Sequence, residues 1–219
     1  MQWWHYAEYC RCISQGRPHE EAKLWMESFV ESMNSCDARG RREFVAWLMT
    51  VVMERDRGQE LWDIVPKELR RGVIDPTLQE WCLAEVSDPR PFRWYCNVLN
   101  RAGNSEGAME YLEKAFEMDA SDERTKIQLV VWLSDDVEFE LRSVLEGRDL
   151  DEPEVELAKA ERALSIAATV GDARRRGEWL KFLVPAREAL INILEWKVSG
   201  DPDLAGWARA NNKRVTYWD

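Results

Sequence analysis

The sequence predicts an all-α fold: an array of antiparallel helical hairpins, either an α-solenoid or a bundle, with about 9–11 helices. Apolar residues recur three and four positions apart along most of the 219 residues, which is the spacing of one face of an α-helix. Gly, Pro and Asp interrupt this pattern at short intervals, so consecutive helices are joined by short turns and pair as hairpins. We find no segment in which apolar and polar residues alternate as in a β-strand.

The N-terminal part, residues 1–72, is expected to form helical hairpins. Gly16-Arg17-Pro18 ends the first helix and begins the second, because Pro is tolerated in the first turn of a helix. Asp37 and Gly40 mark the next turn. The expected helices of this part are 2–14, 18–35 and 41–56.

The first of these helices carries more aromatic side chains than one helix face can bury. They are Trp3, Trp4, Tyr6 and Tyr9. This excess indicates either a helix that is packed on two sides or a contact in a dimer. The sequence leaves the oligomeric state open.

Between Gly58 and Gly72 the helical pattern is weaker. A short helix is expected there, which Pro66 ends or restarts. Its apolar residues are Leu61, Trp62, Ile64 and Val65.

Three later helices are expected to begin with the same pair of residues. An Asp carboxylate accepts a hydrogen bond from an unpaired N–H of the first turn, and the Pro after it lacks an N–H that would have no partner there. The pairs are Asp75-Pro76, Asp88-Pro89 and Asp201-Pro202.

The remaining chain continues as helices separated by turns. Gly171 is expected to cap the C-terminus of one helix. Pro185 is expected to kink the long helix that contains it, because it removes one backbone hydrogen bond. The expected helices are 76–86, 90–102, 104–118, 122–145, 154–170, 173–198 and 201–211. We expect one all-α domain over 1–219, with hairpins in 1–72, a core in 73–146 and C-terminal helices in 153–219.

Residues 91–122 resemble a tetratricopeptide repeat, a helix-turn-helix unit of about 34 residues. Large, small and Ala residues stand where the repeat has them, and Gly103 lies at the turn between the two helices. The stretch departs from the repeat at Asp119-Ala120-Ser121, where Pro is usual. The matching residues are Phe92, Tyr95, Cys96, Leu99, Gly103, Ala108, Leu112 and Ala115.

The resemblance covers one repeat, residues 89–122. A second repeat beginning near Glu123 would place Lys126 where a large apolar residue is expected, unless the register shifts by one residue. The whole chain is also similar to uncharacterised bacterial proteins in which a WxxAxPxDP-like stretch leads into one such repeat. Here that stretch runs from Trp81 to Pro89.

The resemblance implies that the first helix of the repeat lines a concave groove. Arg followed by Asn four residues later resembles half of a carboxylate clamp, in which a guanidinium fork and an amide hold an acidic group. The groove residues that this register implies are Arg90, Arg93, Asn97, Asn100 and Arg101, and the next helix would add Arg124 and Gln128. The alternative is that these arginines form ion pairs with nearby Glu106, Asp122 or Asp135.

The composition favours a cytoplasmic protein and disfavours two classes of partner. A net charge of −11 repels the nucleic-acid backbone and anionic membranes, so we expect neither as a partner. The start of the chain lacks the pattern of a signal peptide, and no apolar run is long enough for a spanning helix. The five cysteines are therefore expected to be reduced thiols.

No catalytic, cofactor or metal site is expected. The two His residues both lie near the N-terminus, and neither a Gly-flanked Ser nor a phosphate-binding Gly loop occurs. Cys10 and Cys12 point about 200° apart on a helix and cannot both bind one zinc ion; Cys82 and Cys96 are expected in the core. The basic clusters Arg39/Arg41/Arg42 and Arg174/Arg175/Arg176 are expected to pair with the acidic loop 149–156 or with neighbouring helices.

Two classes of function remain. The first is a non-enzymatic helical-repeat module that binds a protein or peptide, whose acidic end would enter the groove lined by Arg and Asn. The alternative is an acidic immunity or antitoxin-like protein that neutralises a basic partner. A small enzyme would need a desolvated carboxylate in a closed pocket.

Overall fold

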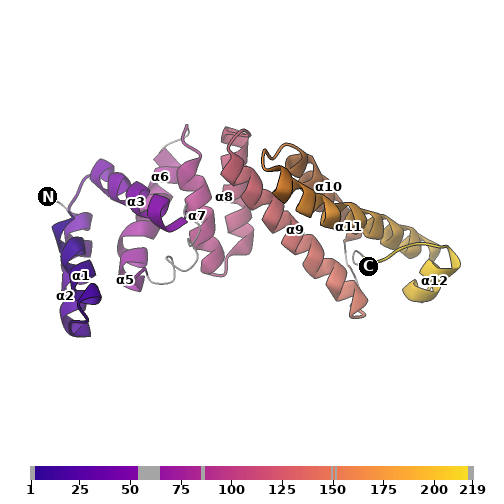
Figure 1. The fold of residues 1–219 in the computed structure, drawn as a ribbon, viewed down its shortest axis with the longest axis horizontal. Helices are drawn as coiled ribbons and strands as arrows, with labels where there is room; N and C mark the ends of the chain where they lie inside the picture. Colours follow the sequence, from indigo (N-terminus) through magenta and orange to yellow (C-terminus); the bar gives the residue numbers. More distant parts are fainter. Residues whose placement is uncertain (1–2, 54–64, 85–86, 149, 151, 217–219) are drawn as a thin grey trace. The chain divides into compact units, whose positions relative to one another are not determined.

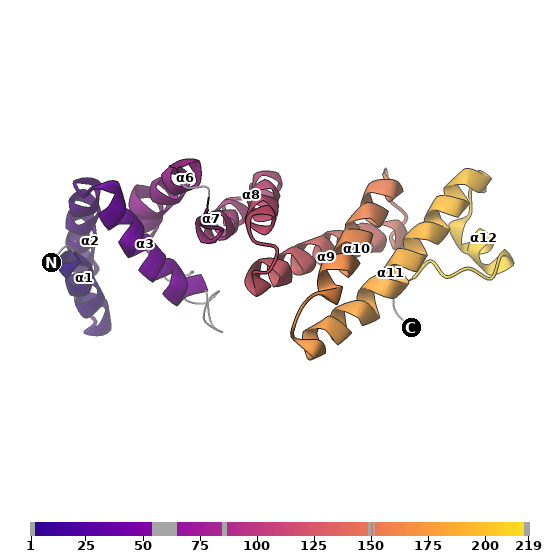
Figure 2. The same ribbon diagram turned by 90° about the horizontal axis from the view of Figure 1, so that it is seen from above.

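The structure, a computed structural model, describes residues 3–53, 65–84, 87–148, 150 and 152–216. These residues form ten helices when the continuous α5, η1 and α6 are counted as one, and no β-strand occurs among them. Within each of the two units described below, consecutive helices pack against one another (Figures 1 and 2). The prediction of an all-α array of helices is confirmed.

The chain divides into two compact units, residues 1–118 and 119–219. The boundary directly follows α8 and lies inside the subregion 73–146 that the sequence predicts as one core. Each unit has its own cluster of buried apolar side chains, and each is described by itself below.

The first unit contains α1 to α8. Its helices are α1 (Trp4–Ser14), α2 (His19–Asn34), α3 (Ala38–Met53), α5 (Lys67–Leu69), the π-helical turn η1 (Arg70–Ile74), α6 (Asp75–Ala84), α7 (Arg90–Arg101) and α8 (Ser105–Met118). The predicted short helix around Leu61, Trp62 and Ile64 lies outside the described residues.

Aromatic side chains surround α1 on two sides. Trp3 packs edge-to-face on Phe44 of α3, with ring centroids 5.3 Å apart. Trp4 packs edge-to-face on Trp25 of α2, with centroids 5.0 Å apart. The aromatic side chains at this helix therefore pack against both α2 and α3, as expected for a helix packed on two sides.

The segments α5, η1 and α6 form one continuous helix, and Asp75 does not begin it. The backbone of Asp75 is helical (φ −56°, ψ −54°), and its N–H donates to the carbonyl of Arg70 five residues earlier. The expectation of an N-cap at Asp75 was wrong. The ring of Pro76 would meet the carbonyl of Gly72 in a regular α-helix. A π turn directly before Pro76 widens the helix there, so the helix continues instead of starting anew.

Gly72 also allows this helix to approach α2 closely. A Cβ atom at Gly72 would lie 2.7 Å from Cγ1 of Val30, which is closer than two carbon atoms can approach. The apolar side of the helix, including Leu69, Val73 and Ile74, is fully buried in the core of the first unit.

The hairpin predicted from residues 91–122 is present as α7 and α8. Gly103 has φ +83°, a conformation that only Gly adopts at little cost, and it forms the turn. Cys96, Ala108, Leu112 and Ala115 are completely buried, so the small residues of the repeat pattern let the two helices approach. Tyr95 and Tyr111 meet edge-to-face across the hairpin, with centroids 4.8 Å apart.

The second unit contains α9 (Glu123–Leu145), α10 (Pro153–Ala168), α11 (Ala173–Ser199) and α12 (Leu204–Ala210). α10 packs on both α9 and α11, and α12 packs on α11 (Figures 1 and 2). Ala160, Ala186 and Ala189 are completely buried, and these small side chains let the helices approach closely. α11 continues as one α-helix through Pro185.

Asp residues cap three helices of this unit, α9, α11 and α12, although not all at the predicted positions. Asp122 accepts from the N–H of Thr125, and Asp172 accepts from those of Arg174 and Arg175. For α12 the cap is Asp203, which accepts from Gly206, and Asp201 instead accepts from the N–H of Asp203. The prediction of a cap at Asp201 was therefore wrong by two residues, because the chain makes one more turn before α12 begins.

Gly171 is not the C-cap of α10. That position belongs to Thr169, and the N–H of Gly171 donates to the Glu123 carboxylate at 2.6 Å. The side chain of a distant helix in the same unit therefore satisfies this backbone group, which a local sequence pattern does not reveal.

Replacing Leu112 by Ala should lower the free energy of unfolding by about 2–5 kcal/mol, because it leaves a cavity between α7 and α8. Leu112 is completely buried, whereas Leu83 in α6 is 78% exposed. Leu83→Ala is the matched control and should change stability by about 0.5 kcal/mol or less. Urea unfolding followed by circular dichroism measures both, and equal losses would contradict the assigned core.

Candidate functional site

At the start of α7, Arg90 is held by Asp88. Nε and Nη2 of Arg90 donate to Oδ1 and Oδ2 of Asp88 at 2.9 and 2.8 Å, and the backbone N–H of Arg90 donates to Oδ1 at 3.0 Å. The guanidinium also lies over the Trp94 ring, 5.9 Å from its centroid. The prediction of an N-cap at Asp88 was wrong by one residue, because Pro89 is the N-cap, although Asp88 still accepts the N–H of the first helical residue, Arg90.

The charge of Asp88 is stabilised by its surroundings. Burial by itself would raise the pKa of this carboxyl group, but the hydrogen bonds and charge of Arg90, together with the charge of Arg93, outweigh burial and lower it. Asp88 and Arg90 thus form an ion pair at the start of α7. The sequence analysis gave ion pairing as the alternative to ligand binding for this arginine, and here the acidic partner is Asp88.

The next residues of the predicted groove face differ in exposure. Arg93 is only 5% exposed. Asn97 donates its amide to the carbonyl of Arg93 at 3.0 Å. Asn100 is exposed and accepts from Ser105 at 3.4 Å. Arg101 is half-buried and is the residue of this face that lines a pocket.

That pocket, called the basic pocket below, lies where the end of α7 meets the helix formed by α5, η1 and α6. Its volume is about 220 Å³. Four cationic side chains and one carboxylate line it. The lining residues are Lys67, Arg70, Arg71, Asp75, Val98, Arg101 and Ala102.

The continuous helix positions the three cations that the sequence analysis missed. Lys67, Arg70 and Arg71 are three and four residues apart and therefore lie on one side of the helix. The packing of α6 on α7 then brings Arg101 to the same side. The basic residues shortly before Asp75-Pro76 could have indicated this site in the sequence. If Asp75 is interpreted as an N-cap, however, these residues are assigned to the end of a preceding helix.

Asp75 is the carboxylate among these cations. Its Oδ1 is buried and accepts no hydrogen bond from the described residues. Burial raises the pKa of Asp75 above its ordinary value, while the charges of Arg70 and Arg71 oppose the increase. The pocket thus combines excess positive charge with a partly desolvated carboxylate.

Arg124 and Gln128, predicted to complete the clamp, belong to α9 in the second unit. Arg124 is exposed and Gln128 is half-buried. Their combination with the α7 face stays a prediction.

The two basic clusters seen in the sequence pair within their own units. In the first unit, Arg41 binds Glu80 of α6 at 2.7 Å, and Arg42 lies 5.7 Å from the Trp81 ring centroid. The Arg174/Arg175/Arg176 cluster pairs locally with Glu178, Asp172 and the carbonyl of Val170. The predicted pairing with a neighbouring helix is confirmed for Arg41, whereas the partners of the Arg174 cluster lie on its own helix and just before it, not on the predicted loop or helices.

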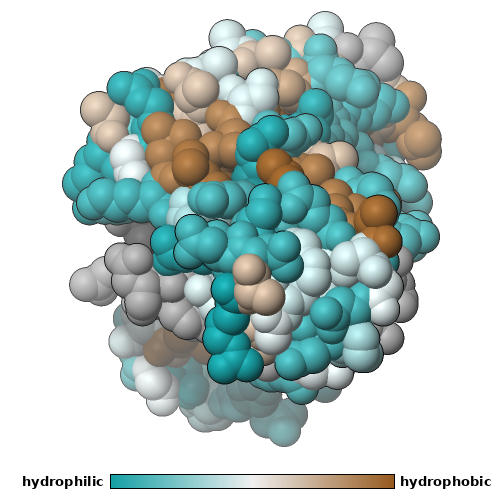
Figure 3. Space-filling model, turned by 90° about the vertical axis from the view of Figure 1, so that its right-hand side faces the viewer, coloured by the Kyte–Doolittle hydropathy of each residue, from teal (hydrophilic) through white to brown (hydrophobic). Residues whose placement is uncertain are grey.

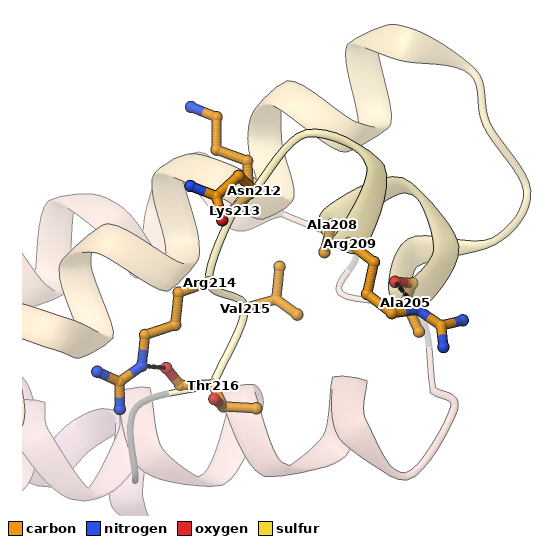
Figure 4. A pocket seen from close by; sticks show the side chains of 8 residues that line it. All are labelled: Ala205, Ala208, Arg209, Asn212, Lys213, Arg214, Val215 and Thr216. Carbon is orange, nitrogen blue, oxygen red and sulfur yellow. Dashed lines mark hydrogen bonds between the residues drawn. The ribbon is translucent and has the colours of Figure 1, made fainter.

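A larger hollow of about 530 Å³ lies between α12 and the segment that follows it. Figure 4 shows Val215 pointing toward the side of α12 that carries Ala208, while Lys213 points away. The cations here already have partners: Arg209 donates to Ala205, Arg214 to Thr216, and Lys213 pairs with Glu195 at 2.8 Å. This hollow is a weaker candidate for an anion than the basic pocket.

The surface also carries apolar side chains. Figure 3 shows hydrophobic areas that interrupt a mostly hydrophilic surface. Exposed apolar side chains include Phe139, Val184 and Val198. Among the described residues, every helix is too short or too polar to cross a lipid bilayer.

The cysteines give no sign of a reactive or metal-binding site. Burial raises the pKa of both Cys82 and Cys96 to about 12, so the predicted core role of these two residues is confirmed. Cys12 is buried while Cys10 is exposed. Within the described part of the chain, no three His, Cys, Asp or Glu side chains are arranged to hold a metal ion.

Comparisons with protein-family models, with curated proteins and with solved structures give no match for this chain. The residues of the basic pocket are therefore the basis for inferring function.

Replacing Asp88 by Ala should cost about 1 kcal/mol of folding stability near neutral pH, because the start of α7 loses both an acceptor and an ion pair. The pKa of Asp88 is lowered in the folded state. Its contribution is therefore present above the unfolded-state pKa of about 3.9 and is lost as the pH falls through the lower folded-state pKa.

Urea unfolding of both proteins across this pH range measures the effect, with Glu110→Ala on the exposed side of α8 as the control. A stability difference that persists unchanged in strong acid would contradict the assignment of the ion pair.

Proposed function

We propose that this protein is a non-enzymatic helical-repeat module that binds an acidic segment of a protein or peptide partner at the basic pocket. The observation that carries the proposal is the meeting of Arg101 from α7 with Lys67, Arg70 and Arg71 from the adjacent helix around one hollow. Cationic side chains that are about one helical hairpin apart in the sequence thus line the same pocket.

The chemistry of the lining favours a carboxylate-bearing ligand. Arginine guanidinium groups hold carboxylates with two parallel hydrogen bonds, and the lysine adds a mobile charge. The rest of the chain is strongly acidic, with a net charge of −11. An anion is therefore repelled from most of the surface and attracted here.

The size of the pocket favours one group of a longer ligand. A volume of about 220 Å³ is below the usual range for pockets that enclose a whole small molecule, roughly 300–1,000 Å³. It suits one acidic side chain or a chain terminus.

The finer family assignment is part of this proposal. The α7–α8 hairpin, with its buried Cys96, Ala108, Leu112 and Ala115, supports a tetratricopeptide-like unit related to bacterial repeat proteins. The proposed location is the cytoplasm. All five cysteines are free, which suits a reducing compartment.

Binding of a fluorescein-labelled hexaglutamate peptide, followed by fluorescence anisotropy, tests the function. Arg71→Ala and Arg101→Ala should each weaken binding about tenfold, because each removes charge-assisted hydrogen bonds. Raising the salt concentration should weaken binding by the wild-type protein. The matched control is Arg39→Ala, since Arg39 is a cation of the same unit that pairs with Glu43 on α3.

Circular dichroism establishes that each variant is folded. If Arg39→Ala weakens binding as much as the two pocket variants, or if the wild-type protein does not bind the peptide, the proposed function is wrong.

The second candidate is an acidic immunity or antitoxin-like protein, and crowding of acids in the second unit favours it. Asp135 is followed by Asp136, Glu138 and Glu140 on α9. The pKa of Asp135 is raised by burial and then by the negative charges of Glu138 and Asp136. A basic partner would relieve this repulsion.

For this candidate, the variant Asp135→Asn/Glu138→Gln should bind an octa-arginine peptide about fivefold more weakly than wild type by isothermal titration calorimetry. Glu110→Gln/Glu117→Gln, two exposed positions of α8, changes the net charge equally and should have a smaller effect. Equal losses would mean that net charge alone attracts the peptide, and would reject a binding face on α9.

A further inference from the structure

We propose that Asp75 is a built-in competitor for the anion, so that the basic pocket binds anions more tightly when Asp75 is uncharged. This inference rests on the proposed function, because it concerns the regulation of the same pocket. Its ligand class is the anionic group of an acidic partner, and its regulator is the proton.

The π turn places Asp75 against two arginines. Its N–H donates to the carbonyl of Arg70, so residues five apart are aligned along this turn, as Arg70 and Asp75 are. Arg71, four residues before Asp75, lies on the adjoining side. The charges of both arginines act on the Asp75 carboxylate, and both arginines line the pocket.

The carboxylate is held there without a complete set of hydrogen bonds. Oδ1 of Asp75 is buried and accepts no hydrogen bond from the described residues. A buried acceptor without a donor is unfavourable, and the nearby cations offset this cost while Asp75 is ionised. When an external anion binds to those cations, ionised Asp75 loses part of its favourable interaction with them and is repelled by the negative charge of the anion.

Asp75 is the carboxyl group of the pocket lining, so it is the lining residue whose negative charge is removed by protonation. The other charged side chains of the lining are Lys67, Arg70, Arg71 and Arg101. The charge of Asp75 also acts on Tyr95 of α7. The pKa of Tyr95 is raised by burial, then by Tyr111 and by the charge of Asp75, so Tyr95 remains neutral.

The other helices that pack on this segment present few charges to Asp75. α2 and α3 meet it through apolar side chains such as Phe29 and Phe44. The arginines of α3 that reach α6 contact Glu80 and Trp81, more than one turn beyond Asp75. Glu68 of α5 lines a separate hollow together with α2.

The direction of the pH dependence follows from these charges. With Asp75 ionised, the four cations and one carboxylate of the lining leave three positive charges in excess, and with Asp75 protonated they leave four. Anion affinity therefore rises as the pH falls through the pKa of Asp75. Burial places that pKa above its ordinary value, which moves the change toward weakly acidic pH.

Inorganic sulfate is the probe, because it remains a dianion between about pH 5 and pH 8 and does not titrate itself. Its binding to the full chain is followed by nuclear magnetic resonance of the arginine side chains. Asp75→Asn should bind sulfate at least about threefold more tightly than wild type near pH 7. Wild-type affinity should rise as the pH is lowered through the raised pKa of Asp75, while that of Asp75→Asn should stay nearly constant.

Glu117→Gln is the matched control for net charge. Glu117 is exposed on α8, about 18 Å along the helix axis from the turn that adjoins Arg101. It should leave sulfate affinity close to that of wild type. A further test needs only the wild-type protein. Saturation with sulfate should raise the pKa of the Asp75 carboxyl group, which is measured from the pH dependence of its carbon resonance.

The outcomes separate this inference from the proposed function. If Arg71→Ala weakens sulfate binding but Asp75→Asn binds like wild type, or if the Asp75 pKa does not respond to sulfate, Asp75 is not a competitor and the pocket still binds anions. If Arg71→Ala and Arg101→Ala leave sulfate binding unchanged, the pocket does not bind anions and both proposals fail.

Discussion

The π-helical turn η1 is the constraint on which the basic pocket depends. Pro76 would interrupt a regular α-helix through its ring and its missing N–H. The wider turn of Arg70–Ile74 accommodates it, and one helix runs from Lys67 to Ala84. Because the helix does not restart, its basic first part and its acidic Asp75 keep a fixed relation to each other and to α7. Single π turns inside α-helices are frequently found at functional sites.

Charge in this acidic protein is mostly neutralised close to where it occurs. Arg90 is held by Asp88, Arg41 by Glu80, and the Arg174 cluster by its own helix and the turn before it. Such partly exposed pairs contribute little stability individually, but they leave their cations with less attraction for an external ligand. The lining of the basic pocket contains more cations than carboxylates, and this composition underlies both the proposed function and the inferred role of Asp75.

Much of the fold was predictable because its signals are local. The α7–α8 hairpin follows from Gly103 and from small residues at helical spacing, and the structure contains both. Helix caps were predicted less well. Asp75 and Asp201 are followed by Pro just as Asp88 is, yet the first lies inside a helix and the second lies two residues before the cap. An Asp-Pro pair shows where a helix can start, whereas the neighbouring packing decides whether it does.

The sequence by itself determined the class of fold, the order of the helices and the burial of the repeat-like residues, because apolar spacing and turn residues act over a few positions. It also predicted Arg101 as a groove residue, and the proposed function builds on that prediction. Only the tertiary structure decided which cations share a pocket. Lys67, Arg70 and Arg71 meet Arg101 because α6 packs on α7, and contacts between distant segments depend on how whole helices fit together. The sequence predicted Asp75 as a helix cap, but in the packed structure it is a partly buried carboxylate among cations.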